Sequence, residues 1–309
     1  MSKLRIGIIG LGNIAQKVYL PFLSAEKNWS FVGGYSPTES KRKKICGMYR
    51  INAFSSPADL IKSSDAVFVS SSTNSHFEIV SEALKLDKAV YVDKPLASTS
   101  DEAEQLAELS IQHNRKLMVG FNRRFSPMYL QAKEKVTAGT SLIRIEKHRV
   151  DSIRTENFDI TLLDDYIHLV DTARWFGEPK GNNCICGSIK VNENNELIFA
   201  HHNYETKSGA SIFTAMHRKA GTNLERLELI TEDAFVRVKD MDTFEIETNG
   251  KIEISTSPAW EIILKRKGFE DAILHFIDSI EGNTQPLVNG EEALKTQRFF
   301  DSMIKHRNN

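Results

Sequence analysis

Cysteine, net charge and long apolar segments are all scarce in this 309-residue sequence, and each scarcity excludes a class of protein. The three cysteines cannot all pair in disulfides. Cys184 and Cys186 would lie on one face of a strand and lack the Cys-x-x-Cys spacing of a metal site. We therefore expect reduced thiols in a cytoplasmic protein and no metal site. Lysine and arginine total 40 against 41 acidic residues, so no net field attracts nucleic acid or an anionic membrane. No apolar run approaches the ~18 residues that span a bilayer.

After these exclusions, we expect a folded protein that binds a small molecule. Hydrophobic residues make up 40% of the chain and charged residues 26%, which is typical of a globular protein. Because a single core rarely grows beyond ~200 residues, the length predicts two domains. We place them at 1–121 and 122–309.

Short apolar segments alternate with helical periodicity in the first part of the chain. We expect strands at 5–9, 31–35, 66–70, 89–92 and 117–120, with helices at 13–25, 38–46, 75–86 and 100–113. Ser100 is expected to open the last of these helices, with Asp101 and Glu102 near its positive end. This alternation predicts a doubly wound parallel sheet of the Rossmann type.

The pattern changes after residue 125. Helical segments near 126–137 and 158–176 flank a block in which apolar and polar residues alternate, as in LERLELI, AFVRVKD, FEIET and KIEIS. Two helices, at about 268–281 and 290–306, close the chain. The alternation predicts an antiparallel or mixed sheet with one packed face, whose second face meets solvent or another subunit.

A glycine motif stands between the first predicted strand and helix. Gly10, Gly12 and Ala15 form G-x-G-x-x-A, in which the first glycine permits a sharp turn and the second allows a pyrophosphate to approach the backbone. The following helix presents unpaired N–H groups to the phosphates. We therefore assign Asn13 and Ile14, together with both glycines, to dinucleotide binding.

The end of the second predicted strand bears on the choice of coenzyme. NAD sites usually carry an acidic residue there, but this sequence has Ser36 after Tyr35. The missing carboxylate removes repulsion against a 2′-phosphate, which Lys41 and Arg42 could neutralise. The coenzyme is thus NADP or NAD, with a slight preference for NADP. A solvated helix face explains the basic residues 41–44 at least as well.

Several segments together resemble the Gfo/Idh/MocA oxidoreductases, and more closely the MviM group within them. The matching segments are GLGNIAQKVYLP, SSSTNSHFEIV, VYVDKPLA, VGFNRRFSPMY and LLDDYIHLVDTARWFGEP, in the family's order between residues 7 and 179. The resemblance implies an NAD(P)-dependent enzyme that acts mostly on sugars, polyols or their derivatives. It also implies a Rossmann domain followed by an α/β domain built on a large open, mostly antiparallel sheet.

Asp93, Lys94 and Pro95 match the family's Glu-Lys-Pro motif, with aspartate in place of glutamate. A lysine at the carboxyl end of a parallel strand lies at the edge where open α/β sheets bind ligands. There it can hold a substrate oxygen and favour its deprotonation. We assign Lys94 to catalysis, and Asp93 with Lys94 also to the coenzyme site. A surface lysine at a strand end is the alternative.

His168 shares a predicted helix face with Asp164 and Asp171. The resemblance implies that His168 is the general acid/base and Asp164 its partner or a substrate contact. A carbinol that loses hydride must also lose a proton, which suits an imidazole. A structural histidine is the alternative, and Asp165 is expected to be only a neighbour.

Two further segments resemble coenzyme-binding parts of the family. Ser71, Thr73, Asn74 and His76 match the loop that passes under the nicotinamide ribose, although His76 fits equally well as a helix-start residue that packs on the loop. Asn122 and Arg124 match the segment after the last Rossmann strand. Arg123 could anchor an anionic substrate or form an ion pair at the domain interface.

Our leading hypothesis is a dehydrogenase or reductase that transfers hydride between a nicotinamide coenzyme and a sugar, polyol or related carbinol. The alternatives are a non-catalytic NAD(P)-binding regulator, since fold alone does not fix chemistry, and an NAD-dependent glycoside-cleaving enzyme. A half-apolar exposed sheet face also predicts a homodimer or homotetramer formed through the C-terminal sheet.

Overall fold

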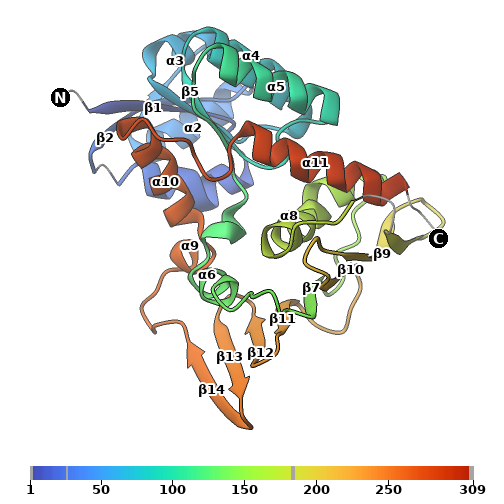
Figure 1. Cartoon of the computed structure of the whole chain (residues 1–309). Helices are drawn as coiled ribbons and strands as arrows, with labels where there is room; N and C mark the ends of the chain where they lie inside the picture. Colours follow the sequence, from blue (N-terminus) through green and yellow to red (C-terminus); the bar gives the residue numbers. More distant parts are fainter. Residues whose placement is uncertain (1–2, 26, 182–184, 306–309) are drawn as a thin grey trace. The chain divides into compact units, whose positions relative to one another are not determined.

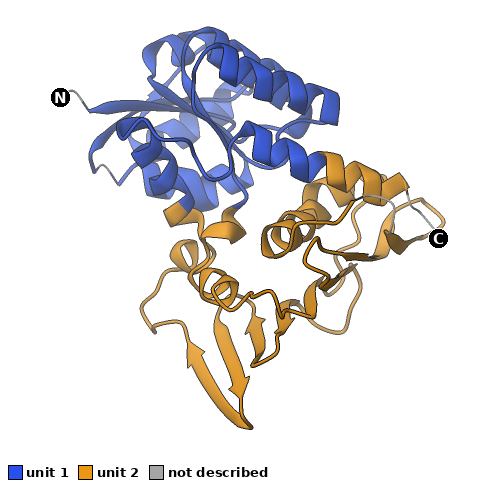
Figure 2. Ribbon diagram, viewed as in Figure 1, with its two compact units in different colours: residues 1–121, 272–297 blue, residues 122–271, 298–309 orange. Residues whose placement is uncertain are grey.

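The computed structural model describes residues 3–25, 27–181 and 185–305 (Figure 1). Contacts group the chain into two compact units, coloured separately in Figure 2. Unit 1 contains residues 1–121 and 272–297, and unit 2 contains residues 122–271 and 298–309. The assignment of every residue after 121 to a second domain stays a prediction, and residues 272–297 group with unit 1 by their contacts.

Unit 1 is built on a parallel six-stranded sheet. Its order is β3-β2-β1-β4-β5-β6, which is the order of a dinucleotide-binding Rossmann fold and confirms the predicted fold class. The strands are β1 (Leu4–Ile9), β2 (Trp29–Tyr35), β3 (Asn52–Ala53), β4 (Ala66–Val69), β5 (Ala89–Val92) and β6 (Leu117–Val119). The four residues of β4 and those of β5 are all buried, as expected for strands covered on both faces.

Helices connect these strands. They are η1 (Ala15–Tyr19), α1 (Leu20–Leu23), α2 (Glu39–Tyr49), α3 (Pro57–Ser63), η2 (Thr73–Ser75), α4 (His76–Lys85) and α5 (Ser100–Gln112). Two later helices, α10 (Phe269–Glu281) and α11 (Gly290–Lys305), follow the last strand of the chain, and their residues 272–297 group with unit 1. Helix α5 begins at Ser100, as predicted, and the residue before it is the cap. Thr99 caps α5, because its side chain accepts a bond from the Glu102 N–H while the Glu102 carboxylate accepts one from the Thr99 N–H.

Aromatic side chains fill the core of unit 1 beside the central strands. Phe68 and Tyr91 stack with ring centroids 4.8 Å apart, and Phe276 meets the edges of both rings at 5.6 Å. Tyr19 packs against the same pair of rings. Because Phe276 belongs to α10, burial of this cluster ties a late helix to the early strands.

Unit 2 contains an eight-stranded sheet in the order β14-β13-β12-β11-β7-β10-β9-β8. All neighbours are antiparallel except β7 and β10, which confirms the predicted mostly antiparallel sheet. The strands are β7 (Leu142–His148), β8 (Cys186–Val191), β9 (Leu197–Glu205), β10 (Ser211–His217), β11 (Leu224–Ile230), β12 (Phe235–Lys239), β13 (Thr243–Thr248) and β14 (Lys251–Thr256). Cys186 begins β8, whereas Cys184 lies outside the described residues.

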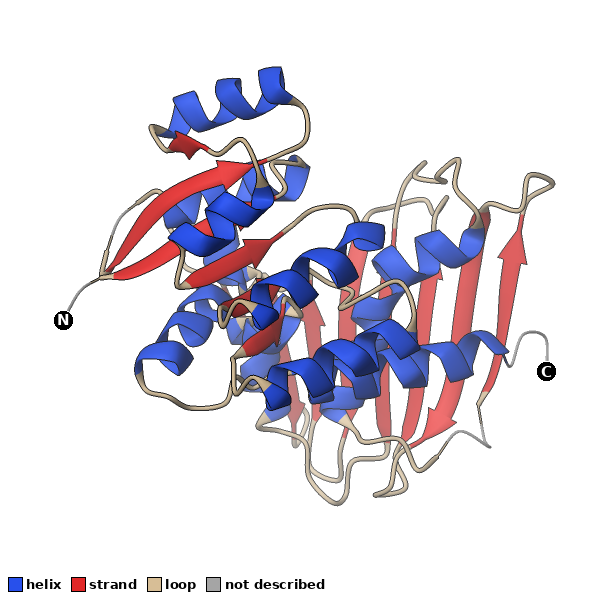
Figure 3. Cartoon of the chain, turned by 90° about the horizontal axis from the view of Figure 1, so that it is seen from above, coloured by secondary structure: helices blue, strands red, loops and turns tan. Residues whose placement is uncertain are grey.

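Helices lie along one face of this sheet (Figure 3). They are η3 (Asn122–Phe125), α6 (Pro127–Lys133), α7 (Phe158–Thr161), η4 (Leu162–Tyr166), α8 (Ile167–Phe176) and α9 (Ile263–Arg266). On β7, Ile143 and Ile145 are buried beneath α8, while Leu142 and Arg144 on the other face are half-buried. The predicted helix 126–137 ends early, at Lys133.

Two of the expected helices contain π-helical turns. The segment η1 follows the glycine motif, and η4 carries Asp164 and Asp165. Such turns are rare and occur frequently at functional sites, because they change the direction of the side chains that follow. Among the described residues, no helix has both the length and the apolar character that a membrane crossing requires.

Candidate active site

The glycine motif forms a tight turn at the carboxyl end of β1. Gly10 has a φ of 97°, and its N–H donates to the carbonyl of Tyr35 at 2.9 Å. A Cβ atom at Gly10 would lie 2.4 Å from the backbone of Ser70 and Ser71, so a side chain is excluded. A Cβ at Gly12 would meet nothing within 4 Å. The turn is therefore closed on the sheet side at Gly10 and open at Gly12, where the sequence predicts the pyrophosphate.

The loop after β4 lies against this turn. Ser70 Oγ donates to the carbonyl of Gly10 at 2.9 Å, and Ser75 Oγ donates to Ser71 Oγ at 2.7 Å. Because β1 and β4 are neighbours where the strand order reverses, this is the switch point at which such sheets bind ligands. Thr73 is half-buried and Asn74 exposed in η2. Ser71 therefore follows the residue that contacts the glycine turn, and Thr73 and Asn74 lie in the short helix η2 just after it.

The basic residues after β2 have separate environments. Arg42 is 8% exposed, donates to the carbonyl of Ser36 at 2.7 Å and lies over the ring of Tyr35. Lys41 is exposed, and Lys43 pairs with Glu39 one turn earlier on α2. The buried Ser36 and Arg42 are therefore held at the end of β2, whereas Lys41 lies on a solvated helix face.

Asp93 has a partner that sequence reasoning did not find. Tyr19 Oη donates to Asp93 Oδ1 at 3.1 Å, and the Asp93 N–H donates to the carbonyl of Val69 at 2.8 Å. Burial raises the pKa of Asp93, while Lys94 and His76 act in the opposite direction. Burial, followed by Asp93, raises the pKa of Tyr19, so Tyr19 stays a donor at neutral pH. Lys94 follows, half-buried, and its peptide bond to Pro95 is cis.

His76 begins α4 and is 1% exposed. Its Nδ1 lies 2.9 Å from the carbonyl of Pro95, and its Nε2 lies 3.3 Å from the carbonyl of Ser71. Burial lowers the pKa of His76, and a neutral imidazole can donate to only one of the two carbonyls. His76 therefore links the Asp-Lys-Pro segment to the loop after β4, and its role in coenzyme binding stays a prediction.

Asn122, Arg123 and Arg124 belong to unit 2 and are all buried. Asn122 donates to the carbonyl of Lys267 at 2.7 Å, and Arg124 binds both carboxylate oxygens of Asp171 at 2.9 and 2.6 Å. Arg123 does the same with Glu225, at 2.5 and 2.9 Å. Each of the three is thus held by a partner within unit 2.

The candidate acid/base lies on the helix that covers the large sheet. His168 is 9% exposed in the first turn of α8, and Asp164 lies in the π-helical turn before it. Asp164 accepts a hydrogen bond from Arg154. Asp164 therefore has a charged partner within unit 2, and His168 is largely shielded from solvent.

A group of buried charges close to Asp164 in the chain was not predicted. Lys147 and Arg218 both donate to the carboxylate of Asp165, and Lys147 is the β7 residue opposite Glu225. A signal was present: Lys147 follows Ile143 and Ile145 in the inward phase of β7. Asp165, which we expected to be a neighbour of the acid/base residues and not a participant, accepts hydrogen bonds from both cations.

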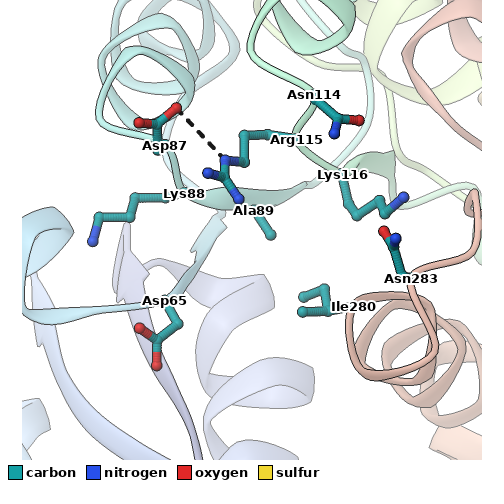
Figure 4. A pocket seen from close by; sticks show the side chains of 9 residues that line it. All are labelled: Asp65, Asp87, Lys88, Ala89, Asn114, Arg115, Lys116, Ile280 and Asn283. Carbon is teal, nitrogen blue, oxygen red and sulfur yellow. Dashed lines mark ion pairs between the residues drawn. The ribbon is translucent and has the colours of Figure 1, made fainter.

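A separate polar cavity of about 250 Å³ lies at the opposite, amino edge of the unit 1 sheet (Figure 4). Asp87 and Arg115 pair across it at 3.6 Å. The lining residues are Asp65, Asp87, Lys88, Ala89, Asn114, Arg115, Lys116, Ile280 and Asn283. Because coenzymes bind at the carboxyl ends of such strands, this cavity is not the dinucleotide site. Within the described ranges, no cluster of three or more histidine, cysteine or acidic residues could hold a metal.

The strand order, the glycine turn and the lysine after β5 define an oxidoreductase with an NAD-binding Rossmann fold. The family model described as "Oxidoreductase family, NAD-binding Rossmann fold" matches residues 4–121, and "YceM-like, C-terminal domain" matches residues 127–249. The chain belongs to the Gfo/Idh/MocA family of oxidoreductases, as the sequence resemblance predicted.

Individual relatives support this assignment over the whole length. The chain is 41% identical to the "Putative oxidoreductase YceM" of Salmonella typhimurium over 98% of each sequence. It is 25% identical to an inositol 2-dehydrogenase of Saccharopolyspora erythraea, covering 89% of this chain and 85% of the relative. The structure of a dehydrogenase, MviM, from Clostridium difficile superposes with a TM-score of 0.92 at 46% identity, covering 98% and 99% of the two chains.

Proposed function

We propose that this protein is a dehydrogenase or reductase that transfers hydride between NADP or NAD and a carbinol of a sugar, a polyol or a related compound. The observation that carries the proposal is the glycine turn at the β1–β4 switch point, with Lys94 two residues after the end of the neighbouring strand β5. Relatives named inositol dehydrogenases make a polyhydroxylated substrate a reasonable class.

The residues of the turn fit a dinucleotide. Gly10 allows the backbone to fold tightly, the space at Gly12 admits a pyrophosphate, and Asn13 and Ile14 begin the helix that presents free N–H groups. The loop bearing Ser71 and the segment bearing Asp93 complete the coenzyme side. The nicotinamide, when bound, supplies the hydride acceptor or donor.

The chain itself handles the proton and the substrate oxygen. Lys94 holds the reacting oxygen and favours its alkoxide form, because a cation lowers the free energy of the developing negative charge. His168 takes the proton as the carbinol is oxidised and returns it in the reverse reaction. Asp164 orients the substrate or the imidazole, and Arg154 fixes its carboxylate.

We also propose that the open face of the large sheet binds a second copy of the chain. Residues of both charges alternate on this face, including Arg226, which pairs with Glu146 on the adjacent strand. The edge strand β14 adds Ile252 and Ile254, which are 58% and 63% exposed. A face with paired charges and exposed apolar groups is suited to self-complementary association. Sedimentation analysis should show a dimer or tetramer that Ile254→Glu weakens.

The activity is tested by following nicotinamide absorbance with both coenzymes over a panel of polyols and sugars. We expect turnover that requires Lys94, and an unchanged rate for Lys94→Ala would contradict the mechanism. Tight coenzyme binding without turnover would favour a regulatory module, and bond cleavage without net coenzyme reduction would favour a glycoside-cleaving enzyme. Gly10→Ala should abolish coenzyme binding, because the turn excludes a Cβ atom.

A further inference from the structure

Five charged side chains are buried together on the helix-covered face of the unit 2 sheet. They are exposed by no more than 8% each, and their two carboxylates hold three cations. Arg123 binds Glu225, while Lys147 and Arg218 share Asp165. Asp165 lies in η4, next to Asp164 and three residues before His168. This group, called here the cation cluster, therefore adjoins the segment proposed to carry the acid/base chemistry.

The cation cluster carries more positive than negative charge. Burial, assisted by Arg123, lowers the pKa of Lys147 to about 8 although Asp165 and Glu225 oppose this. A buried cation that is not fully compensated costs free energy. The two carboxylates can compensate only two of the three buried cations. The imbalance indicates that a further negative charge belongs here.

Two more cations lie at the partly exposed rim of the cluster. Lys267 interacts electrostatically with Glu225 and with Arg123 and Arg149, and burial lowers its pKa. In the part of the chain that the structure describes, neither the Lys267 ammonium nor the Arg149 guanidinium has an ion pair or hydrogen bond. Both side chains are half-buried, so they are partly desolvated without a direct ionic partner. An incoming anion can therefore reach these two side chains, whereas the buried side chains of the cluster are closed to it.

We propose that the cation cluster and its rim bind an anionic group of the substrate, a carboxylate or a phosphate, so that the substrate is an acidic sugar derivative. Lys267 and Arg149 contact the anion, and the buried pairs fix the positive potential behind them. The link to catalysis rests on the proposed function, whereas the binding of the anion does not. A neutral polyol would lack the group that the cluster attracts.

The test is calorimetric titration of the full chain with three probes at one ionic strength: D-gluconate, D-glucose 6-phosphate and neutral D-glucitol. We expect at least one of the two anions to bind more tightly than glucitol, and its chemistry identifies carboxylate or phosphate. Lys267→Met and Arg149→Met should each weaken the anion about tenfold, the typical loss of one charged contact. These rim positions avoid the folding defect that Lys147→Met could cause.

Lys251→Met is the matched control, because it removes one positive charge from an exposed strand of the same unit. It should leave anion binding unchanged. The proposal is overturned if glucitol binds as well as the anions, if neither anion binds, or if the rim variants match the wild type.

Nicotinamide absorbance recorded with the same probes separates this inference from the proposed function. Anion binding that depends on Lys267 without any turnover would retain the inference and contradict the dehydrogenase proposal. Turnover of neutral polyols without anion binding would retain the dehydrogenase and reject the acidic substrate class.

Discussion

Tyr19 donates a hydrogen bond of 3.1 Å to Asp93, and this bond joins the helix after the glycine turn to the residue before Lys94. Aspartate stands where the family motif has glutamate, so its shorter side chain needs a partner that approaches closely. Gly120 provides the room, since a Cβ there would lie 3.3 Å from both the Tyr19 hydroxyl and the Asp93 carboxylate. The substitution within the motif is thus accommodated by neighbours from two other elements.

Removal of this hydroxyl should destabilise unit 1. Tyr19→Phe removes one donor from a packed carboxylate, and we expect the free energy of unfolding in urea to fall by about 1–3 kcal/mol. Tyr49→Phe is a suitable control, because its hydroxyl makes only a long bond of 3.4 Å to the carbonyl of Gln16. Equal stability of the two variants would show that the bond to Asp93 contributes nothing.

The two ends of β5 should respond differently to loss of a lysine. Lys94→Ala is expected to lower kcat/KM by about 10²–10⁴, because it removes the group that holds the reacting oxygen. Lys88 precedes the same strand at its amino end and lines the cavity of Figure 4. Steady-state kinetics of Lys88→Ala should match the wild type, and similar losses in both variants would argue for a structural effect.

A histidine on each face of the large sheet allows the acid/base assignment to be tested. His168→Gln should reduce kcat by about 10²–10⁴ with coenzyme affinity retained, because glutamine cannot accept the proton. His201 lies in β9 and stacks on Phe213. His201→Gln should keep full turnover, and a fully active His168→Gln enzyme would assign His168 to structure.

Coenzyme preference should depend on Arg42 more than on its neighbours on α2. Arg42 is fixed at the end of β2 beside Ser36, so we expect Arg42→Ala to weaken NADP about tenfold and NAD little. Lys43→Ala removes a cation that already pairs with Glu39 and should change neither. Fluorescence titration with both coenzymes measures this, and equal losses for NAD and NADP would reject a 2′-phosphate contact.

The buried Lys147 should make stability depend on pH in the alkaline range. Burial lowers its pKa to about 8 from 10.5, so the unfolded chain binds more protons between these values and stability rises with pH. Between pH 8 and 10.5, the free energy of unfolding of the wild type should increase by up to about 3 kcal/mol relative to that of Lys147→Met. Urea unfolding at a series of pH values measures it, and parallel curves for the two proteins would contradict a desolvated lysine.

Much of the fold could be predicted because it depends on local patterns. The turn at Gly10 needs only a glycine after a strand and before a helix, and the strand order follows from alternating elements. The two-residue periodicity of β11 to β14 likewise predicted an antiparallel or mixed sheet. The helix cap at Thr99 was not predicted, since Ser100 and Thr99 are both good caps and only the capping box with Glu102 distinguishes them.

The sequence by itself determined the coenzyme fold, the family and the candidates Lys94 and His168, since motifs and periodicity depend only on residues that are close together in the chain. Tertiary structure alone decided that Tyr19 holds Asp93, that Arg123 pairs with Glu225 and that Asp165 receives Lys147 and Arg218. These partners are 18 to 102 residues apart in the chain. Charge compensation depends on distance in space, and burial sets its strength, so no local pattern could specify it.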